Sequence, residues 1–252
     1  GQAHAIVGPE GFRRGFFIGD GTGIGKGREI AAIIWDNYQQ GRKKAVWLSQ
    51  NKPLLNDAKR DVEGVGWNPD MVFDITKTAY GAVPDNKEGI AFIGYDGLKQ
   101  TQRRENPHTR LDQLISWLGD DFDGVIAYDE SHNMGNAMPS DRGRGSQASQ
   151  KAMVAMQLQE RFPNARVIYV SATGATEVTN LAYCDRLGLW GHGTSFADRG
   201  DFINKIRSAG IAAMEMVAQN LKAMGRYLAR TLSYEGIKYD RLDHVLTEDQ
   251  VA

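Results

Sequence analysis

The sequence predicts an α/β protein whose mostly parallel, doubly wound sheet is flanked by helices and followed by a C-terminal helical extension. Two observations carry this prediction. Short, uninterrupted apolar runs recur along the chain, which is typical of parallel strands covered on both faces. Longer amphipathic stretches separate these runs, and such a strand and helix alternation is typical of a doubly wound sheet.

Five short apolar runs predict the buried strands. They are GFFIG (15–19), KAVWLS (44–49), IAFIGY (90–95), GVIAYDE (124–130) and ARVIYVSAT (165–173). Amphipathic stretches predict helices at about 25–40, 53–62, 109–118, 147–161 and 177–187. Because ligands on such sheets bind beyond the carboxyl ends of the strands, we expect the functional residues there.

From about residue 198 the pattern becomes helical only. Apolar residues recur three or four positions apart, at Ile211, Met214, Val217, Leu221, Met224 and Leu228. We therefore expect a sheet domain at 1–197 and a helical extension at 198–252, docked on the sheet domain or on a neighbour.

Composition limits the class of protein. The 252 residues are 41% hydrophobic and 24% charged, which suits one sizeable α/β domain. A formal net charge of -1 excludes binding to nucleic acid through a strongly basic overall surface, so any such contact must be local. The single cysteine, Cys184, excludes an internal disulfide and suits a reducing compartment. No apolar run approaches the roughly 20 residues that span a bilayer, so we expect an intracellular protein without a membrane partner. The chain starts without Met, and we expect it to be a piece of a longer protein.

The segment GDGTGIGKGRE (19–29) has the properties of a phosphate-binding loop. It follows a predicted strand, is rich in glycine and opens a helix, so backbone N–H groups and the helix dipole can meet a phosphate. Lys26 is placed to reach the β and γ phosphates of a nucleotide. The residues expected to bind the nucleotide are Asp20, Gly21, Thr22, Gly23, Ile24, Gly25, Lys26, Gly27 and Arg28.

This loop departs from the usual pattern at two positions. The first position is Asp20 instead of glycine, and Gly27 stands where a Ser or Thr hydroxyl normally touches Mg²⁺. We therefore expect Mg²⁺ to be held less directly, through water or Thr22.

The segment VIAYDESH supplies the acidic residues that nucleotide hydrolysis needs. Asp129 is expected to coordinate Mg²⁺, through water, and Glu130 to orient or deprotonate the attacking water. His132 is expected to hydrogen-bond the segment SATG (171–174) at the end of the next strand, through Ser171 or Thr173, and so to couple the two.

GDGTGIGKGRE, DESH and SATGA stand in the order of motifs I, II and III of superfamily 2 helicases. Over about residues 11–237, the chain resembles the first RecA-like lobe of the strawberry notch helicase-like family, with VIYVSATGATEVTNLAYCDRLGLWGHGTSF as the most specific stretch. The glycine after the loop lysine is typical of that family, whereas Asn133 replaces the lysine that many members carry. The resemblance implies a RecA-like P-loop NTPase fold, with ATP and Mg²⁺ as cofactors. It also implies catalytic roles for Lys26, Asp129 and Glu130 and coupling through His132, Ser171, Ala172 and Thr173.

Two further segments correspond to helicase motifs that face nucleic acid. WLSQNKPL (47–54) occupies the place of motif Ia, and GYDGL (94–98) that of a later strand-end motif. With the adjacent KQTQRR cluster, they give as candidate contacts Ser49, Lys52, Tyr95, Lys99, Arg103 and Arg104. A solvated charged face explains the KQTQRR cluster equally well.

The leading hypothesis is an ATP-hydrolysing motor lobe of a superfamily 2 helicase or translocase, with DNA favoured over RNA. The resemblance implies that a second RecA-like lobe of the full-length protein supplies an arginine finger worth about 10³ to 10⁵ in rate, so this segment alone is expected to bind ATP weakly and hydrolyse it slowly. One alternative is a nucleotide-dependent scaffold that regulates protein partners in transcription or chromatin. Another is a P-loop small-molecule kinase, which would need a lid with clustered arginines. We expect a cytoplasmic protein if it is bacterial or phage-encoded and a nuclear one if it is eukaryotic.

Overall fold

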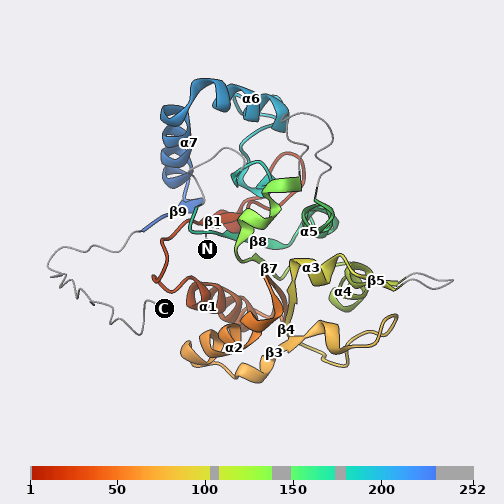
Figure 1. Cartoon of the computed structure of the whole chain (residues 1–252). Helices are drawn as coiled ribbons and strands as arrows, with labels where there is room; N and C mark the ends of the chain where they lie inside the picture. The colour runs from red at the N-terminus through yellow and green to blue at the C-terminus, as the bar shows by residue number, and fades with distance from the viewer. Residues whose placement is uncertain (1, 103–107, 138–148, 174–179, 231–252) are drawn as a thin grey trace, which may run out of the picture.

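The computed structural model describes residues 2–102, 108–137, 149–173 and 180–230, and a seven-stranded parallel sheet forms its centre (Figure 1). The strands lie in the order β3-β4-β2-β7-β8-β1-β9. Their bounds are β1 (Phe16–Ile18), β2 (Lys44–Ser49), β3 (Val72–Asp74), β4 (Gly89–Gly94), β7 (Val125–Tyr128), β8 (Arg166–Val170) and β9 (Tyr227–Leu228). A separate antiparallel pair is formed by β5 (Thr101–Gln102) and β6 (His108–Thr109).

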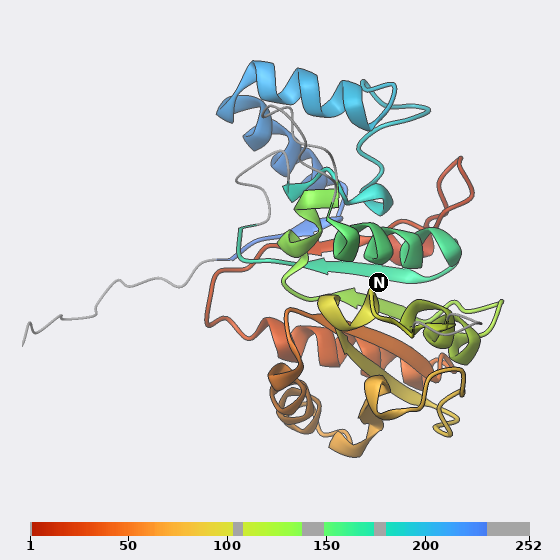
Figure 2. The same cartoon turned by 45° about the vertical axis from the view of Figure 1, so that its right-hand side comes forward.

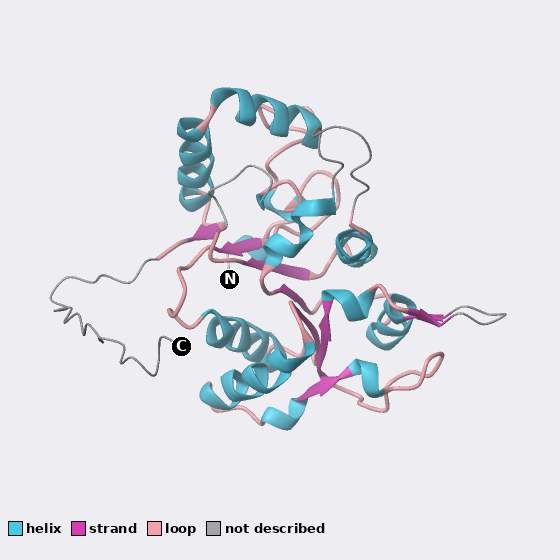
Figure 3. Ribbon diagram, viewed as in Figure 1, coloured by secondary structure: helices cyan, strands magenta, loops and turns pink. Residues whose placement is uncertain are grey.

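Helices cover both faces of the sheet (Figures 2 and 3). They are α1 (Lys26–Gln39), α2 (Leu55–Gly64), α3 (Tyr95–Leu98), α4 (Arg110–Leu118), α5 (Gln150–Arg161), α6 (Arg199–Ala209) and α7 (Ile211–Ala223). Buried apolar side chains form one cluster on each face of the sheet. Side chains of β2 alternate between these two clusters, because successive strand residues point to opposite faces. Trp47 packs with α1 and α2, whereas Val46 and Leu48 pack on the face that α4, α5 and α7 cover.

The five predicted strands and the first four predicted helices are confirmed, with ends shifted by up to three residues. The predicted helix at 177–187 is wrong for its described part. Residues 177–179 lie outside the described residues, and 180–187 form turns and the 3-10 segment Asp185–Leu187 without an α-helix. In this segment the Arg186 side chain is buried, and its guanidinium donates to five backbone carbonyl oxygens of Arg13 and of residues 159–165.

The extension after residue 198 contains a strand as well as helices. After α6 and α7 the chain enters β9, which pairs with β1 and so joins the central sheet. Met214, Val217 and Leu221 of the predicted apolar stripe are buried in the core cluster on one sheet face, while Ile211 is 79% exposed. The extension therefore shares its core with the sheet. No helix in the described ranges is long and apolar enough to cross a membrane.

Candidate functional site

The predicted phosphate loop lies between the carboxyl end of β1 and the N-terminus of α1. Gly23 and Gly25 have φ angles of 86° and 99°, which residues other than glycine rarely adopt, and Gly25 is the N-cap of α1. The Lys26 ammonium donates hydrogen bonds to the carbonyl oxygens of Asp20 and Gly21, each at 3.2 Å. The lysine side chain thus lies folded back over the loop.

Close packing of two helices explains the glycine after the loop lysine. A Cβ atom on Gly27 would lie 1.9 Å from Oδ2 of Asp61, a half-buried residue of α2. Burial raises the pKa of Asp61, and Arg28 Nε lies 4.0 Å from its Oδ1. The space of the usual Ser or Thr side chain is therefore filled by a carboxylate from α2. Of the other expected loop residues, Thr22 is exposed and Ile24 half-buried.

Asp20, the other unusual residue of the loop, is fully buried and binds Arg230. Its Oδ1 accepts from the Arg230 backbone N–H at 2.7 Å and its Oδ2 from Nε at 2.9 Å. The same guanidinium also pairs with Glu29 on α1. Arg230 could not be predicted from the sequence, because 210 residues separate it from Asp20 and no local pattern marks it.

The acidic motif follows β7 at the same edge of the sheet. Asp129 Oδ2 accepts a hydrogen bond from Ser49 Oγ at 3.2 Å, and its Oδ1 accepts one from the Glu130 backbone N–H at 3.0 Å. Burial and the charge of Glu130 raise the pKa of Asp129 to about 6. Among the described residues other than glycine, only Glu130 has a positive φ, 49°, a strained conformation that often occurs at functional sites.

His132 connects the acidic motif with the end of β8. Its Nδ1 lies 3.3 Å from Glu130 Oε2 and 3.2 Å from Ser171 Oγ, and Ser171 Oγ lies 3.2 Å from Thr173 Oγ1. Ala172 between them is half-buried. The contact expected between His132 and Ser171 is present, and it forms a continuous polar chain from Glu130 to Thr173.

The candidate nucleic-acid contacts divide into three groups. Ser49 and Tyr95 are fully buried, and both hydroxyls donate hydrogen bonds to Asp129, that of Tyr95 to the backbone carbonyl at 3.0 Å. Both therefore support the acidic motif and have no exposed surface for a nucleic-acid strand to contact. Lys52 and Lys99 are exposed, and each forms a 2.8 Å ion pair, with Asp74 and Asp96 respectively. Arg103 and Arg104 lie outside the described residues.

The donor set at this edge fits Mg²⁺. Asp129 and Glu130 are adjacent carboxylates, with the His132 ring beside Glu130, and carboxylate oxygens are preferred magnesium ligands. Within the described ranges, no group of three acidic, His or Cys side chains could hold a metal by itself.

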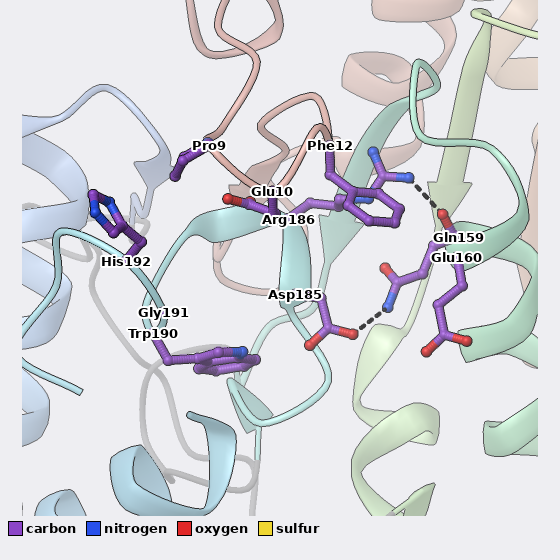
Figure 4. A pocket seen from close by; sticks show the side chains of 10 residues that line it. All are labelled: Pro9, Glu10, Phe12, Gln159, Glu160, Asp185, Arg186, Trp190, Gly191 and His192. Carbon is purple, nitrogen blue, oxygen red and sulfur yellow. Dashed lines mark hydrogen bonds between the residues drawn. The ribbon is translucent and has the colours of Figure 1, made fainter. Parts of the chain in front are cut away.

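A separate cavity of about 610 Å³ lies away from these residues, near the amino ends of β1 and β8 (Figure 4). Its lining includes the rings of Phe12 and Trp190 and the carboxylates of Glu160 and Asp185. No residue of the phosphate loop or of the acidic motif lines it.

Comparison with solved structures shows the fold. The SWI2/SNF2 ATPase core of Sulfolobus solfataricus in complex with dsDNA matches with a TM-score of 0.53 at 15% identity, over 86% of this chain and 40% of that chain. The SWI2/SNF2 ATPase core domain of the same organism matches with a TM-score of 0.51 at 14% identity, over 90% of this chain and 40% of that chain. The fold is therefore the RecA-like fold of these ATPase cores.

Sequence comparisons show the family. The family described as P-loop containing NTP hydrolase pore-1 matches residues 1–252. The chicken protein strawberry notch homolog 1 is 42% identical over 255 residues, which cover 99% of this chain and 20% of that protein. Protein FORGETTER 1 of Arabidopsis thaliana is 43% identical over 243 residues, which cover 95% of this chain and 18% of that protein. The chain thus spans about a fifth of the length of these relatives. It belongs to the strawberry notch family of P-loop containing NTP hydrolases.

Proposed function

We propose that this chain is the ATP-binding motor lobe of a superfamily 2 translocase or helicase that hydrolyses ATP to move on nucleic acid. The observation that carries the proposal is the polar chain from Glu130 through His132 to Ser171. It joins the residue suited to activate water with the end of the neighbouring strand β8. A change at the γ phosphate can thereby reach a second element of the fold.

Each residue of the site has a role that follows from its chemistry. Lys26 exchanges two backbone carbonyls for phosphate oxygens, and the N-terminus of α1 adds its dipole. Asp129 would hold Mg²⁺ through water, and the ion would supply positive charge to the phosphates. Glu130 orients the attacking water or accepts its proton, with its side chain held by His132.

Nucleic acid is proposed to contact the same edge of the sheet. Lys52 and Lys99 lie there, and both are exposed. The structural neighbour that was solved with dsDNA makes duplex DNA the first track to test. We further propose that a second RecA-like lobe of the full-length protein supplies an arginine finger. We also propose that the protein works inside the cell. It would lie in the cytoplasm if bacterial or phage-encoded and in the nucleus if eukaryotic.

The test is the ATPase rate with and without single- and double-stranded DNA and RNA. It uses a chain extended to the length of the relatives, with Glu130→Gln as the control because this variant keeps the shape of the side chain. We expect nucleic acid to stimulate the ATPase rate. We expect the rate of the Glu130→Gln variant to be lower by a factor of about 10² to 10⁴, the usual contribution of a general base. A flat response with ATP still bound would overturn the motor and favour the nucleotide-dependent scaffold.

A further inference from the structure

A negative charge lies inside the loop that should receive a polyphosphate. Asp20 is fully buried, and its own backbone carbonyl is one of the two that hold the Lys26 ammonium. Two anions in a partly dehydrated site repel each other strongly. The loop can therefore accept phosphates only if the Asp20 charge is compensated from within the protein.

Arg230 is the cation that the structure brings to this carboxylate. Its backbone N–H and its guanidinium bind the two different oxygens of Asp20, and the same guanidinium contacts Glu29. Burial pushes the pKa of Asp20 upward, but the hydrogen bonds from Arg230 outweigh it and leave this pKa below its usual value. The pKa of Glu29 is raised, by burial and by the charge of Asp20. Arg230 thus compensates the charge of Asp20 directly, through hydrogen bonds to both carboxylate oxygens.

The main chain fixes Arg230 in this position. Strand β9 lies beside β1 (Figures 1 and 3), and backbone hydrogen bonds continue past both strands into the loop. The Gly19 N–H donates to the Leu228 carbonyl at 2.6 Å, and the Gly21 N–H donates to the Arg230 carbonyl at 2.9 Å. The segment after α7 therefore forms one wall of the phosphate loop, although it lies about 200 residues further along the chain.

We propose that Arg230 is a positioning residue of the nucleotide site, which neutralises Asp20 and holds the phosphate loop in the conformation that accepts a nucleoside triphosphate. This inference rests on the proposed function of the loop. Glu29 also borders the guanidinium from α1, so the charge balance of the loop involves two carboxylates and one arginine. Without Arg230, the loop would present two uncompensated carboxylates to the phosphates.

The test is the dissociation constant of a fluorescent ADP analogue, measured by titration in the full-length chain. We expect Arg230→Gln to weaken binding about tenfold or more, as the loss of a charge-assisted pair usually does. Arg230→Lys keeps the charge and should recover part of the affinity. The double variant Asp20→Asn with Arg230→Gln should recover part of it, because it removes one of the two uncompensated carboxylates, Asp20, and leaves only Glu29. The matched control is Arg161→Gln, since Arg161 is exposed at the end of α5, away from the phosphate loop, and forms an ion pair with Asp120.

The outcomes separate this inference from the proposed function. If the unmodified protein binds no nucleotide, or if Lys26→Ala leaves binding intact, the proposed function fails. If Lys26→Ala abolishes binding while Arg230→Gln leaves it unchanged, only the role of Arg230 fails. A double variant that binds as poorly as Arg230→Gln would also overturn the charge compensation and leave a merely structural role. Circular dichroism shows whether each variant is folded. If Arg230→Gln does not fold, Arg230→Lys and the double variant decide the question.

Discussion

Two buried charged side chains at opposite edges of the central sheet, Asp129 and Arg186, are compensated to very different degrees. At the carboxyl edge, Asp129 and Glu130 lie side by side, the pKa of Asp129 is raised to about 6, and Glu130 has a strained backbone. At the amino edge, Arg186 is 1% exposed, and its guanidinium donates to the carbonyl oxygens of Arg13, Pro163, Ala165, Gln159 and Phe162. The buried charge of Arg186 is thus satisfied by hydrogen bonds within the chain.

The difference separates structural from functional polar groups. A charge whose hydrogen bonds are complete holds the fold together, because removing it leaves its partners unsatisfied. A carboxylate that the fold leaves poorly compensated costs stability and is available to a cation, a water or a substrate. The predictions below test this contrast, in order of expected effect.

The largest effect is expected at Arg186. Arg186→Leu should lower the free energy of unfolding by about 3 to 5 kcal/mol, because several buried carbonyl groups lose their donor. Urea denaturation followed by circular dichroism measures this loss. The control is Arg161→Leu, whose exposed ion pair with Asp120 should be worth less than about 1 kcal/mol. Equal losses for the two variants would mean that the buried hydrogen bonds of Arg186 contribute no more to stability than an exposed ion pair.

The next effect concerns coupling at the carboxyl edge. His132→Ala should reduce the stimulation of ATPase by nucleic acid about tenfold, because it cuts the polar chain between Glu130 and Ser171 while its own side chain is exposed. The free energy of unfolding should change by less than about 0.5 kcal/mol. His192→Ala is the matched control, since His192 is also exposed but lines the cavity at the other edge. Stimulation that survives in His132→Ala would remove the coupling role.

A smaller effect is expected from the titration of Asp129. Its pKa is about 6 in the folded chain and about 3.9 when unfolded, so the folded state binds the proton more tightly and loses stability as the pH rises from 4 to 6. Asp129→Asn removes this loss and should stabilise the protein by about 1 to 2 kcal/mol at pH 8. The gain should fade below pH 4. Urea denaturation at both pH values, without divalent cations, measures it, and a gain that does not depend on pH would contradict the raised pKa.

The smallest effect sharpens the explanation of Gly27. In the native sequence, Gly27→Ala should be close to neutral, because the helix propensity gained, about 1 kcal/mol, is offset by displacing the Asp61 side chain. In an Asp61→Ala background the same substitution should stabilise by about 1 kcal/mol. A double-mutant cycle of unfolding free energies gives the coupling between the two positions. Simple additivity would mean that Asp61 does not explain the glycine.

Local patterns predicted the parts of the site that lie close together in the sequence. Lys26 could be placed because a glycine-rich turn between strand and helix needs few neighbours to form. Asp129 and Glu130 could be placed because they end an apolar run. The surface contacts were predicted less well. Ser49 and Tyr95 end strands as nucleic-acid contacts do, yet neighbouring strands bury both hydroxyls behind the acidic motif.

The sequence by itself determined the alternation of strands and helices, the phosphate loop and the acidic motif, because each depends on residues within one or two turns of the chain. Only the tertiary structure decided which strands are neighbours, that β9 joins the sheet, and that Asp61 fills the space beside Gly27. It also brought Arg230 to Asp20 across 210 residues. Such contacts follow from how the helices and strands pack together, and packing depends on the shapes and burial of many side chains at once, which no short stretch of sequence contains.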